Sequence, residues 1–412
     1  MKIFYMDWAC YAGEDIVRAF SGLRDGKGAA VELVRYPFEN TEKRTDPAFE
    51  ERFLADLTRE EPDAVFSFNF YPLISLVCGR AEKPYIAFVY DSPHIAMYSY
   101  TILNPCNHVY VFDSAVAETF ARQGIGTVHY LPLAADVRRL DEVRADTAAH
   151  RRYDADVAFV GSLYTEEHTF YDRMEPKLDE YTRGYLQAVM DAQLQVDGLN
   201  FVEECLRPPI VEKMLAAYPM EPNPDGVETS AWMYAQYMLN RKITQTERTL
   251  LIRRIGERFG AERTVALYTR DASFSLPGVT NRGRIDYYRE MPLAFKCAKI
   301  NLNLSLRSIE RGMPLRALDI MGAGGFLLTN YQQDFLDFFV PGEDFVYYEN
   351  DEDLLNKIEY YLTHEEERAA IAASAHDKMA ADHTWESRLV LILEDVFGED
   401  AVTMSEMRME EG

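Results

Sequence analysis

The stretch RGMPLRALDIMGAGGFLLTN (residues 311–330) decides the fold, because it joins a loop, a helix start, a glycine-rich helix end and an apolar strand. The apolar run KINLNLS (299–305) precedes it, so the order is strand, loop, helix, strand. A crossover of this kind connects parallel strands of one sheet. Pro314 suits the first helical position, where its missing N–H costs nothing, and the glycines of residues 322–325 suit the helix end.

The helix start in this stretch also has the features of an anion site. The backbone N–H groups of Met313, Leu315 and Arg316, together with the helix dipole, favour a diphosphate. Asp319 follows on the same helix, where a carboxylate can accept hydrogen bonds from the two hydroxyls of a ribose. A plain helix start with a glycine cap explains the spacing about as well, so both interpretations stay open here.

Working outward, short apolar runs alternate with amphipathic helical segments in two series, which predicts two doubly wound α/β domains. The charge-rich stretch 137–152 is expected to link them. The second series has a gap of about a hundred residues, far longer than a simple crossover, which predicts a helical insertion at about 164–247. The last dozen residues are expected to be frayed. The predicted strands are 2–6, 64–68, 85–90 and 108–112 in the first series and 156–162, 264–268, 299–305 and 325–329 in the second.

Composition excludes several classes of function. The 412 residues carry a formal net charge of −25, which repels nucleic acid and anionic lipid. The five cysteines are odd in number and widely spaced, which indicates reduced thiols in the cytoplasm rather than disulfides or a zinc site. The N-terminus does not resemble a signal peptide, and no apolar run is long enough for an integral membrane segment.

Ligands of open α/β sheets bind at the carboxyl ends of the strands, so the residues that follow each strand are the candidates. GSLY (161–164) offers Gly161 and Ser162 to a phosphate, although most such pairs are turns. YDSPH (90–94) offers Asp91 and His94 as a base or an acceptor ligand, against the alternative of a capped turn. MDWACYAG (6–13) adds Asp7.

Several motifs are absent or unsuitable. The sequence has no P-loop, no nucleophile elbow and no dinucleotide fingerprint, and no cluster with metal-ligand spacing. The D-x-D of Asp154 and Asp156 precedes its strand and therefore lies at the wrong end of the sheet. We expect no metal and no cofactor beyond a co-substrate.

Taken in order, the motifs resemble the CgeB-like bacterial glycosyltransferases, relatives of the large family 4 group. Residues 283–292, 300–335, 353–372 and 382–388 are similar to the C-terminal half of that family. FSFNFYP (66–72), YIAFVYDSPH (85–94) and LPLAAD (131–136) are similar to its N-terminal domain.

The resemblance implies a GT-B fold with two Rossmann-like domains facing a cleft and a helical insertion in the second. It implies an acceptor-side domain of residues 1–137 plus 384–412, to which the last helix (about 384–397) returns. Residues 138–383 would form the nucleotide-sugar domain. The family acid that touches the donor sugar lies eight positions before the ribose acid, and Arg311 stands there in this chain, with Glu310 beside it. Arg307 or Arg316 is expected to replace the usual Arg/Lys pair at the diphosphate.

We therefore expect a metal-independent glycosyltransferase that moves a sugar from a nucleotide-diphosphate sugar, with a UDP-sugar as first choice, to a glycan or protein acceptor in glycan biosynthesis. The alternatives are a nucleotide-sugar epimerase or hydrolase of GT-B fold, and a degenerate sugar-nucleotide-binding protein without catalysis. The predicted catalytic residues are Asp91, His94 and Glu310, and the predicted acceptor-side residues are Asp7, Trp8 and Asn69. The predicted donor-nucleotide residues are Gly161, Ser162, Arg270, Arg284, Arg307, Gly312, Met313, Pro314, Leu315, Arg316 and Asp319.

Overall fold

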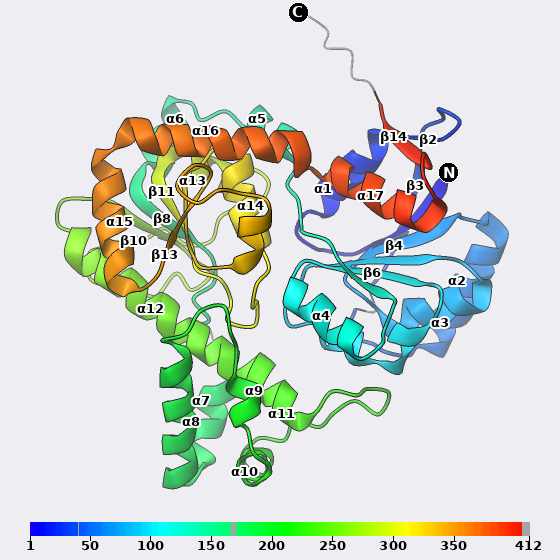
Figure 1. The fold of residues 1–412 in the computed structure, drawn as a ribbon, viewed down its shortest axis with the longest axis horizontal. Coiled ribbons are helices and arrows are strands. Elements are labelled where there is room, and N and C mark those ends of the chain that lie inside the picture. Colours follow the sequence, from blue (N-terminus) through cyan, green and yellow to red (C-terminus); the bar gives the residue numbers. More distant parts are fainter. Residues whose placement is uncertain (40, 166–169, 406–412) are drawn as a thin grey trace, which may run out of the picture. The chain divides into compact units, whose positions relative to one another are not determined.

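The computed structural model describes residues 1–39, 41–165 and 170–405. They form two compact units, each built around a six-stranded sheet (Figure 1). Unit 1 comprises Met1–Asp136, Asp225–Val227 and the chain from Ala381 onward, and unit 2 comprises Val137–Pro224 and Glu228–Ala380. One short piece of the predicted insertion, Asp225–Val227, thus belongs to unit 1. Part of that insertion, 166–169, and the end of the chain, 406–412, lie outside the described residues.

The sheet of unit 1 is parallel throughout, in the order β3-β1-β4-β5-β6-β7. Figure 1 shows α2, α3 and α4 on one face of this sheet and α1 and α17 on the other. The strands are β1 (Lys2–Asp7), β3 (Glu32–Pro37), β4 (Ala64–Phe68), β5 (Tyr85–Val89), β6 (Asn107–Val111) and β7 (Val128–Tyr130). The helices are α1 (Gly13–Ser21), α2 (Pro47–Glu60), α3 (Pro72–Ala81), α4 (Ser114–Arg122) and α17 (Trp385–Phe397), with short 3-10 turns η1 (Ile95–Tyr98) and η2 (Tyr100–Leu103).

The central strands of unit 1 are mainly apolar because both faces of the sheet are covered. On one face Val65 and Ala87 share a core with Phe53 of α2. On the other, the ring of Trp385 on α17 packs edge-on against Phe68 and Phe88, with centroids 5.4 and 5.8 Å apart. The last long helix of the chain, α17, therefore covers part of one face of the unit 1 sheet.

The C-terminal segment is more ordered than its sequence indicates. β14 (Val402–Met404) pairs antiparallel with β2 (Leu23–Asp25), and Val402 is buried. The expectation of a frayed end was therefore wrong for these residues. Two runs of three residues each gain strand structure by pairing with each other, and runs this short show no period that a local pattern could reveal.

The sheet of unit 2 has the strand order β10-β9-β8-β11-β12-β13, again parallel throughout. In chain order this is 3-2-1-4-5-6, the dinucleotide-fold arrangement, whose direction reverses between its first and fourth strands. That reversal lies between β8 and β11. The strands are β8 (Ala155–Val160), β9 (Val265–Tyr268), β10 (Val279–Asn281), β11 (Ala298–Asn303), β12 (Leu327–Asn330) and β13 (Val346–Tyr348).

Helices cover this sheet and continue into the insertion. The sheet-covering helices are α5 (Val137–Glu142), α6 (Thr147–Tyr153), α12 (Asn240–Phe259), α13 (Met291–Cys297), α14 (Leu315–Gly322), α15 (Asp351–Thr363) and α16 (Glu365–Asp382), with a 3-10 turn η5 (Gln333–Asp337). The stretch 137–152, predicted to be a linker, contains α5 and α6 instead. The reason is local: Asp146 caps α6 through Ala149 N (2.8 Å), and Leu140 and Tyr153 are buried.

The insertion has its own apolar core, which includes Met174, Leu186, Met214 and Ile243. Figure 1 shows its helices grouped around one end of α12. The first turns of α12 belong to this cluster, whereas its later residues Leu251 and Ile255 belong to the core of the sheet. The insertion comprises α7 (Phe170–Met174), η3 (Glu175–Lys177), α8 (Glu180–Gln193), α9 (Val202–Cys205), α10 (Pro208–Ala217), α11 (Ser230–Met233) and the π-helical turn η4 (Tyr234–Leu239).

Candidate functional site

The reversal point of the unit 2 sheet is tied together by Arg248 of α12. Its Nη1 donates to the carbonyl oxygen of Ser162, just after β8 (2.6 Å), and its Nε donates to that of Leu304, just after β11 (2.9 Å). Arg248 is buried. A single side chain thus fixes the two strand ends between which ligands of such sheets bind.

Arg316, in the first turn of α14, reaches the same place. Its Nη1 donates to the carbonyl of Val160, the last residue of β8. A Cβ at Gly161 would lie 3.0 Å from the ring of Phe159, so the close packing of that ring favours glycine, whereas Arg316 Nη1 would lie at ordinary contact distance, 3.7 Å. Arg316 Nε is buried and has no hydrogen-bond partner among the described residues. We call Arg248, Arg316 and residues 161–164 the arginine cradle.

The charges of the arginine cradle favour an anion. Burial lowers the pKa of Arg248. The charges of Tyr164 and Glu247 act to raise this pKa, and the nearby charge of Arg316 lowers it further. Arg241 and Arg248 both lie over the ring of Tyr164, with guanidinium carbons 5.4 and 5.3 Å from its centroid. Like charges held this close are stabilised by an anion between or beside them.

The start of α14 adds backbone donors to the arginine cradle. Pro314 is the N-cap residue and the helix begins at Leu315, one position later than the sequence predicted. Ala317 N donates to Pro314 O (3.0 Å). The N–H groups of Leu315 and Arg316 come before this bond, where a helix offers no acceptor of its own. The residues before the helix, Gly312 and Met313, are buried. A helix N-terminus beside two arginines suits a phosphate.

The glycines end α14 as the sequence predicted. Gly324 has φ +74°, and Gly325 N donates to Ile320 O (2.9 Å), which gives a left-handed helix end. A Cβ at Gly325 would lie only 2.8 Å from Asn301 Nδ2. Close packing of the helix end on β11 therefore requires glycine there.

Asp319 lies deeper than a surface ribose site requires. It is 1% exposed, and its Oδ1 accepts a hydrogen bond from Tyr287 Oη (3.2 Å). The guanidinium of Arg139 stacks over the ring of Tyr287, 5.5 Å from its centroid. Tyr287 therefore covers one carboxylate oxygen, and the ribose role of Asp319 stays a prediction.

The other predicted donor arginines do not belong to the arginine cradle. Arg307 Nε donates to Glu247 Oε2 (2.9 Å) and its Nη1 to Asp197 Oδ1 (2.6 Å), so its guanidinium is used inside unit 2. Arg270 and Arg284 are exposed beyond β9 and β10. For these three, a phosphate role stays a prediction without support from the geometry.

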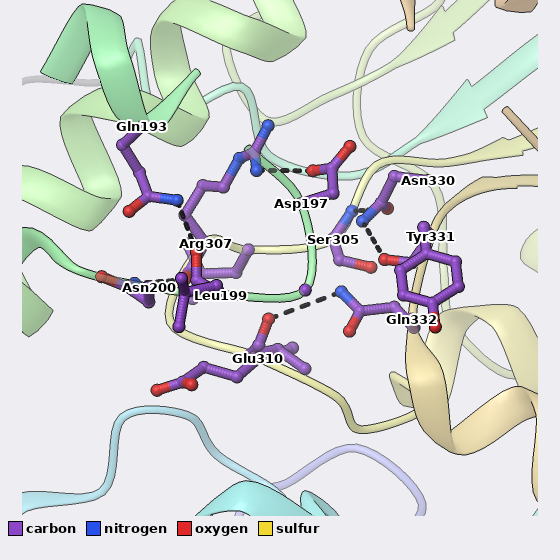
Figure 2. Close-up of a pocket in the computed structure, with 13 residues that line it drawn as sticks. Gln193, Asp197, Leu199, Asn200, Ser305, Arg307, Glu310, Asn330, Tyr331 and Gln332 are labelled. Carbon is purple, nitrogen blue, oxygen red and sulfur yellow. Dashed lines mark hydrogen bonds and ion pairs between the residues drawn. The ribbon is translucent and has the colours of Figure 1, made fainter. Parts of the chain in front are cut away.

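Glu310 lies at a small, partly open pocket of unit 2, at the carboxyl ends of β11 and β12 (Figure 2). One wall of this pocket comes from the insertion and the others from the segments after β11 and β12. We call it the amide pocket, because Gln193, Asn200, Asn330 and Gln332 lie in its wall. Its other lining residues are Asp197, Gly198, Leu199, Ser305, Leu306, Arg307, Ile309, Glu310 and Tyr331.

In unit 1 the predicted residues gather at the ends of β1, β4 and β5. Asn69 is buried with φ 63°; its Nδ2 donates to Asp91 Oδ2 (2.7 Å), and its Oδ1 accepts from Asp91 N (3.2 Å). Trp8 Nε1 donates to Phe68 O (3.3 Å) across the reversal between β1 and β4. Asp7 pairs with Arg35 (2.8 Å). Burial raises the pKa of the neighbouring Cys10 thiol to about 11, which opposes a thiolate there.

His94 has the protonation state of a base. Its Nε2 lies 2.7 Å from the carbonyl oxygen of Phe70, so the proton belongs on Nε2 and the lone pair on Nδ1. Burial lowers the pKa of His94, while the bond to Phe70 and the charge of Asp91 oppose that shift. The ring is therefore neutral at neutral pH. His94 and Asp91 belong to unit 1, whereas Glu310 belongs to unit 2.

The described part of the chain contains one group of side chains whose ligand atoms could share a metal: His150, Asp154 and Cys297, within 4.8 Å of one another. It lies at the amino end of β8, away from the arginine cradle. Burial raises the pKa of the Cys297 thiol to about 11, which opposes the thiolate that a metal needs. No helix among residues 1–39, 41–165 and 170–405 has the length and apolarity to cross a membrane.

Sequence reasoning missed Arg248, Tyr287 and Gln332. Arg248 lies on a long helix without a motif, and only the folded chain brings it to two strand ends. The one available signal for Gln332 was its place just after a strand.

Residues 246–394 match the family model described as glycosyl transferase-like, and this region includes Arg248, Arg316 and Asp319. No curated protein matches the chain. Among solved structures, a glycosyltransferase from Rickettsia africae matches with a TM-score of 0.53 at 8% identity, covering 97% of this chain and 99% of that one.

Two further structures have the same fold. Sucrose-phosphate synthase from Thermosynechococcus elongatus matches with a TM-score of 0.52 at 11% identity, covering 96% and 99% of the two chains. The N-terminal domain of trehalose-6-phosphate phosphatase from Candida albicans matches with a TM-score of 0.51 at 12% identity, covering 95% and 96%. The two Rossmann-like units and these matches show the GT-B fold that the sequence predicted.

Proposed function

We propose that the protein is a metal-independent glycosyltransferase that moves a sugar from a nucleotide-diphosphate sugar, with a UDP-sugar as first choice, to a glycan or protein acceptor. The glycosyl transferase-like region 246–394 and the GT-B fold support the class. The CgeB-like assignment is part of the proposal and rests on the sequence motifs.

The arginine cradle is the observation that carries the proposal. Arg248 and Arg316 converge on the loop after β8, at the point where the strand order reverses, and α14 adds its N-terminus. Two fixed positive charges and backbone donors are suited to a diphosphate that leaves with increased negative charge. In this proposal they supply the charge stabilisation that a metal gives in other transferases.

The remaining roles follow from position. Gly161 and Ser162 border the diphosphate, and Asp319 takes the ribose after Tyr287 gives up its hydrogen bond. His94 Nδ1 accepts the proton of the acceptor hydroxyl while Asp91, held by Asn69, orients the acceptor. Trp8 and Asp7 border the acceptor. The new glycosidic bond forms as the sugar–phosphate bond breaks, and the diphosphate carries away the electron pair.

The test is release of nucleoside diphosphate from a panel of UDP-, GDP-, TDP- and ADP-sugars, with water and with simple oligosaccharides as acceptors. We expect release from the sugars of one nucleotide, and at least a hundredfold less from Arg316→Met. The matched control is Arg253→Met, which changes an exposed arginine on α12. Release that is equal in Arg316→Met, or no release from any donor, would overturn the proposal.

A further inference from the structure

The amide pocket is a second polar site in unit 2, separate from the arginine cradle. Its walls come from three segments: residues 193–200 of the insertion, 305–310 after β11, and 330–332 after β12. Figure 2 shows side chains from all three segments around the pocket. The insertion therefore contributes directly to a site, because it forms one wall of the pocket at the ends of β11 and β12.

The walls of the amide pocket are held rigidly by interactions behind its surface. Asn200 Nδ2 donates to Arg307 O (2.8 Å), and Arg307 N donates to Thr244 Oγ1 (2.9 Å). The guanidinium of Arg307 lies between Glu247 and Asp197. Such a network fixes the backbone of 305–310 before any ligand arrives.

Gln332 is the unusual member of this wall. It is 4% exposed, and its Nε2 donates weakly to Ile309 O (3.4 Å). Its Oε1 is buried and accepts no hydrogen bond from the described residues. A buried carbonyl without a donor is unfavourable and rare, so this oxygen is suited to a donor supplied by a ligand.

The charges of the amide pocket differ from those of the arginine cradle. Asp197 and Glu310 are acids, and Arg307 is the base among its lining residues. The lining thus carries one more negative than positive charge, which disfavours a phosphate. Amide groups, a carboxylate and the half-buried ring of Tyr331 instead offer hydrogen bonds and a flat apolar face to an uncharged ligand with several hydroxyls.

We propose that the amide pocket binds the hydroxyl groups of an uncharged sugar ring, with Gln332 Oε1 accepting one of them. This inference rests on the proposed function for its ligand class. Ser305 in the pocket wall directly follows Leu304, whose carbonyl Arg248 binds in the arginine cradle. Neighbouring strands lie about 4.8 Å apart, so the pocket lies close to the arginine cradle. A sugar in the pocket could therefore be either the glycosyl group of the donor or a sugar of the acceptor.

The experiment is saturation-transfer NMR on the full chain with the methyl glycosides of glucose, galactose, mannose and N-acetylglucosamine, and with glucose 6-phosphate as the charged comparison. We expect transfer to one or more glycosides and less to the phosphate. Gln332→Met keeps the size of the side chain but removes the acceptor, and should weaken binding about tenfold. Leu199→Trp changes an exposed lining residue and should block the pocket without disturbing the core.

The matched control is Gln187→Met, the same change at an exposed glutamine of α8, which should bind like wild type. Transfer to none of the four glycosides, or equal transfer in wild type, Gln332→Met and Leu199→Trp, would overturn the inference. Absence of nucleotide binding together with Gln332-dependent glycoside binding would instead count against the proposed function alone.

Competition identifies the source of the sugar. Each glycoside is paired with UDP-glucose, UDP-galactose, GDP-mannose or UDP-N-acetylglucosamine of the same sugar. Displacement of the glycoside by the nucleotide sugar, but not by the nucleotide alone, assigns the pocket to the donor glycosyl group. Binding of both together assigns it to the acceptor.

Discussion

Replacing Arg316 by methionine is the sharpest perturbation of the arginine cradle. Methionine keeps an unbranched side chain on α14 and removes the guanidinium, including the buried Nε that has no partner among the described residues. The fold loses one hydrogen bond, to the carbonyl of Val160, so we expect a loss of about 1 kcal/mol in the free energy of unfolding.

The expected effect on a phosphate ligand is larger. A hydrogen bond to a charged group contributes about 1.5–3 kcal/mol, which corresponds to roughly 10- to 150-fold in affinity. UDP should therefore bind 10- to 150-fold more weakly to Arg316→Met. Uridine lacks phosphates and should bind both proteins alike, so the ratio of the two affinities isolates the phosphate contact.

The assay is isothermal calorimetry with UDP and uridine, or with the nucleoside diphosphate that binds best and its nucleoside. Arg253→Met controls for the loss of one positive charge on a surface of unit 2. Equal weakening of UDP and uridine, or UDP affinity that matches the control, would refute the assignment of Arg316 to the diphosphate.

Three further predictions test other parts of the account. Burial holds the pKa of His94 below its ordinary 6.5, and protonation of His94 should remove the base. We therefore expect kcat/KM to be constant at neutral pH and to fall as pH drops through the lowered pKa. Folding stability should fall as pH drops from 6.5 to the lowered value, because in that window the unfolded chain binds the proton and the folded chain does not; a pH profile of kcat/KM unchanged in His94→Gln would contradict the role of His94 as the base. Asp319→Asn should weaken UDP about tenfold in calorimetry and should weaken 2′-deoxy-UDP by less, because only the 3′-hydroxyl is left to bind the carboxylate; equal losses would contradict the ribose contact. Trp385→Ala should cost about 3–5 kcal/mol in urea unfolding, since the ring packs on Phe68 and Phe88; a loss below 1 kcal/mol would contradict the place of α17 in unit 1.

The central strands of both sheets were predictable because they are short runs in which apolar residues predominate or alternate with a few polar ones. The runs 64–68 and 264–268 correspond to β4 and β9 to within one residue. The edge elements were not predictable in this way. β3, with exposed or half-buried residues, and β14, with one buried residue, depend on a partner strand for their structure.

The candidate site was predictable where function lies directly after a strand. Gly161, Asn69 and Asp91 follow their strands, and the topology brings Asn69 and Asp91 into contact. Arg248 was beyond sequence reasoning, because its two partners lie 86 and 56 positions away in the chain. Arg307 is the opposite case: its place near a glycine-rich loop suggested a phosphate ligand, and the folded chain pairs its guanidinium with Glu247 and Asp197, so the geometry gives that prediction no support.

A nucleotide screen of the wild-type protein by thermal shift tests the central claim most directly. The ligands are UDP, GDP, TDP, ADP and CMP, each with its common sugars and its nucleoside. A ligand at about 100 times its dissociation constant adds roughly 2.7 kcal/mol of stability. The account predicts stabilisation by one nucleotide and its sugars, little by the nucleoside, and loss of the effect in Arg316→Met. Stabilisation by none of these nucleotides would contradict a nucleotide-sugar site in unit 2.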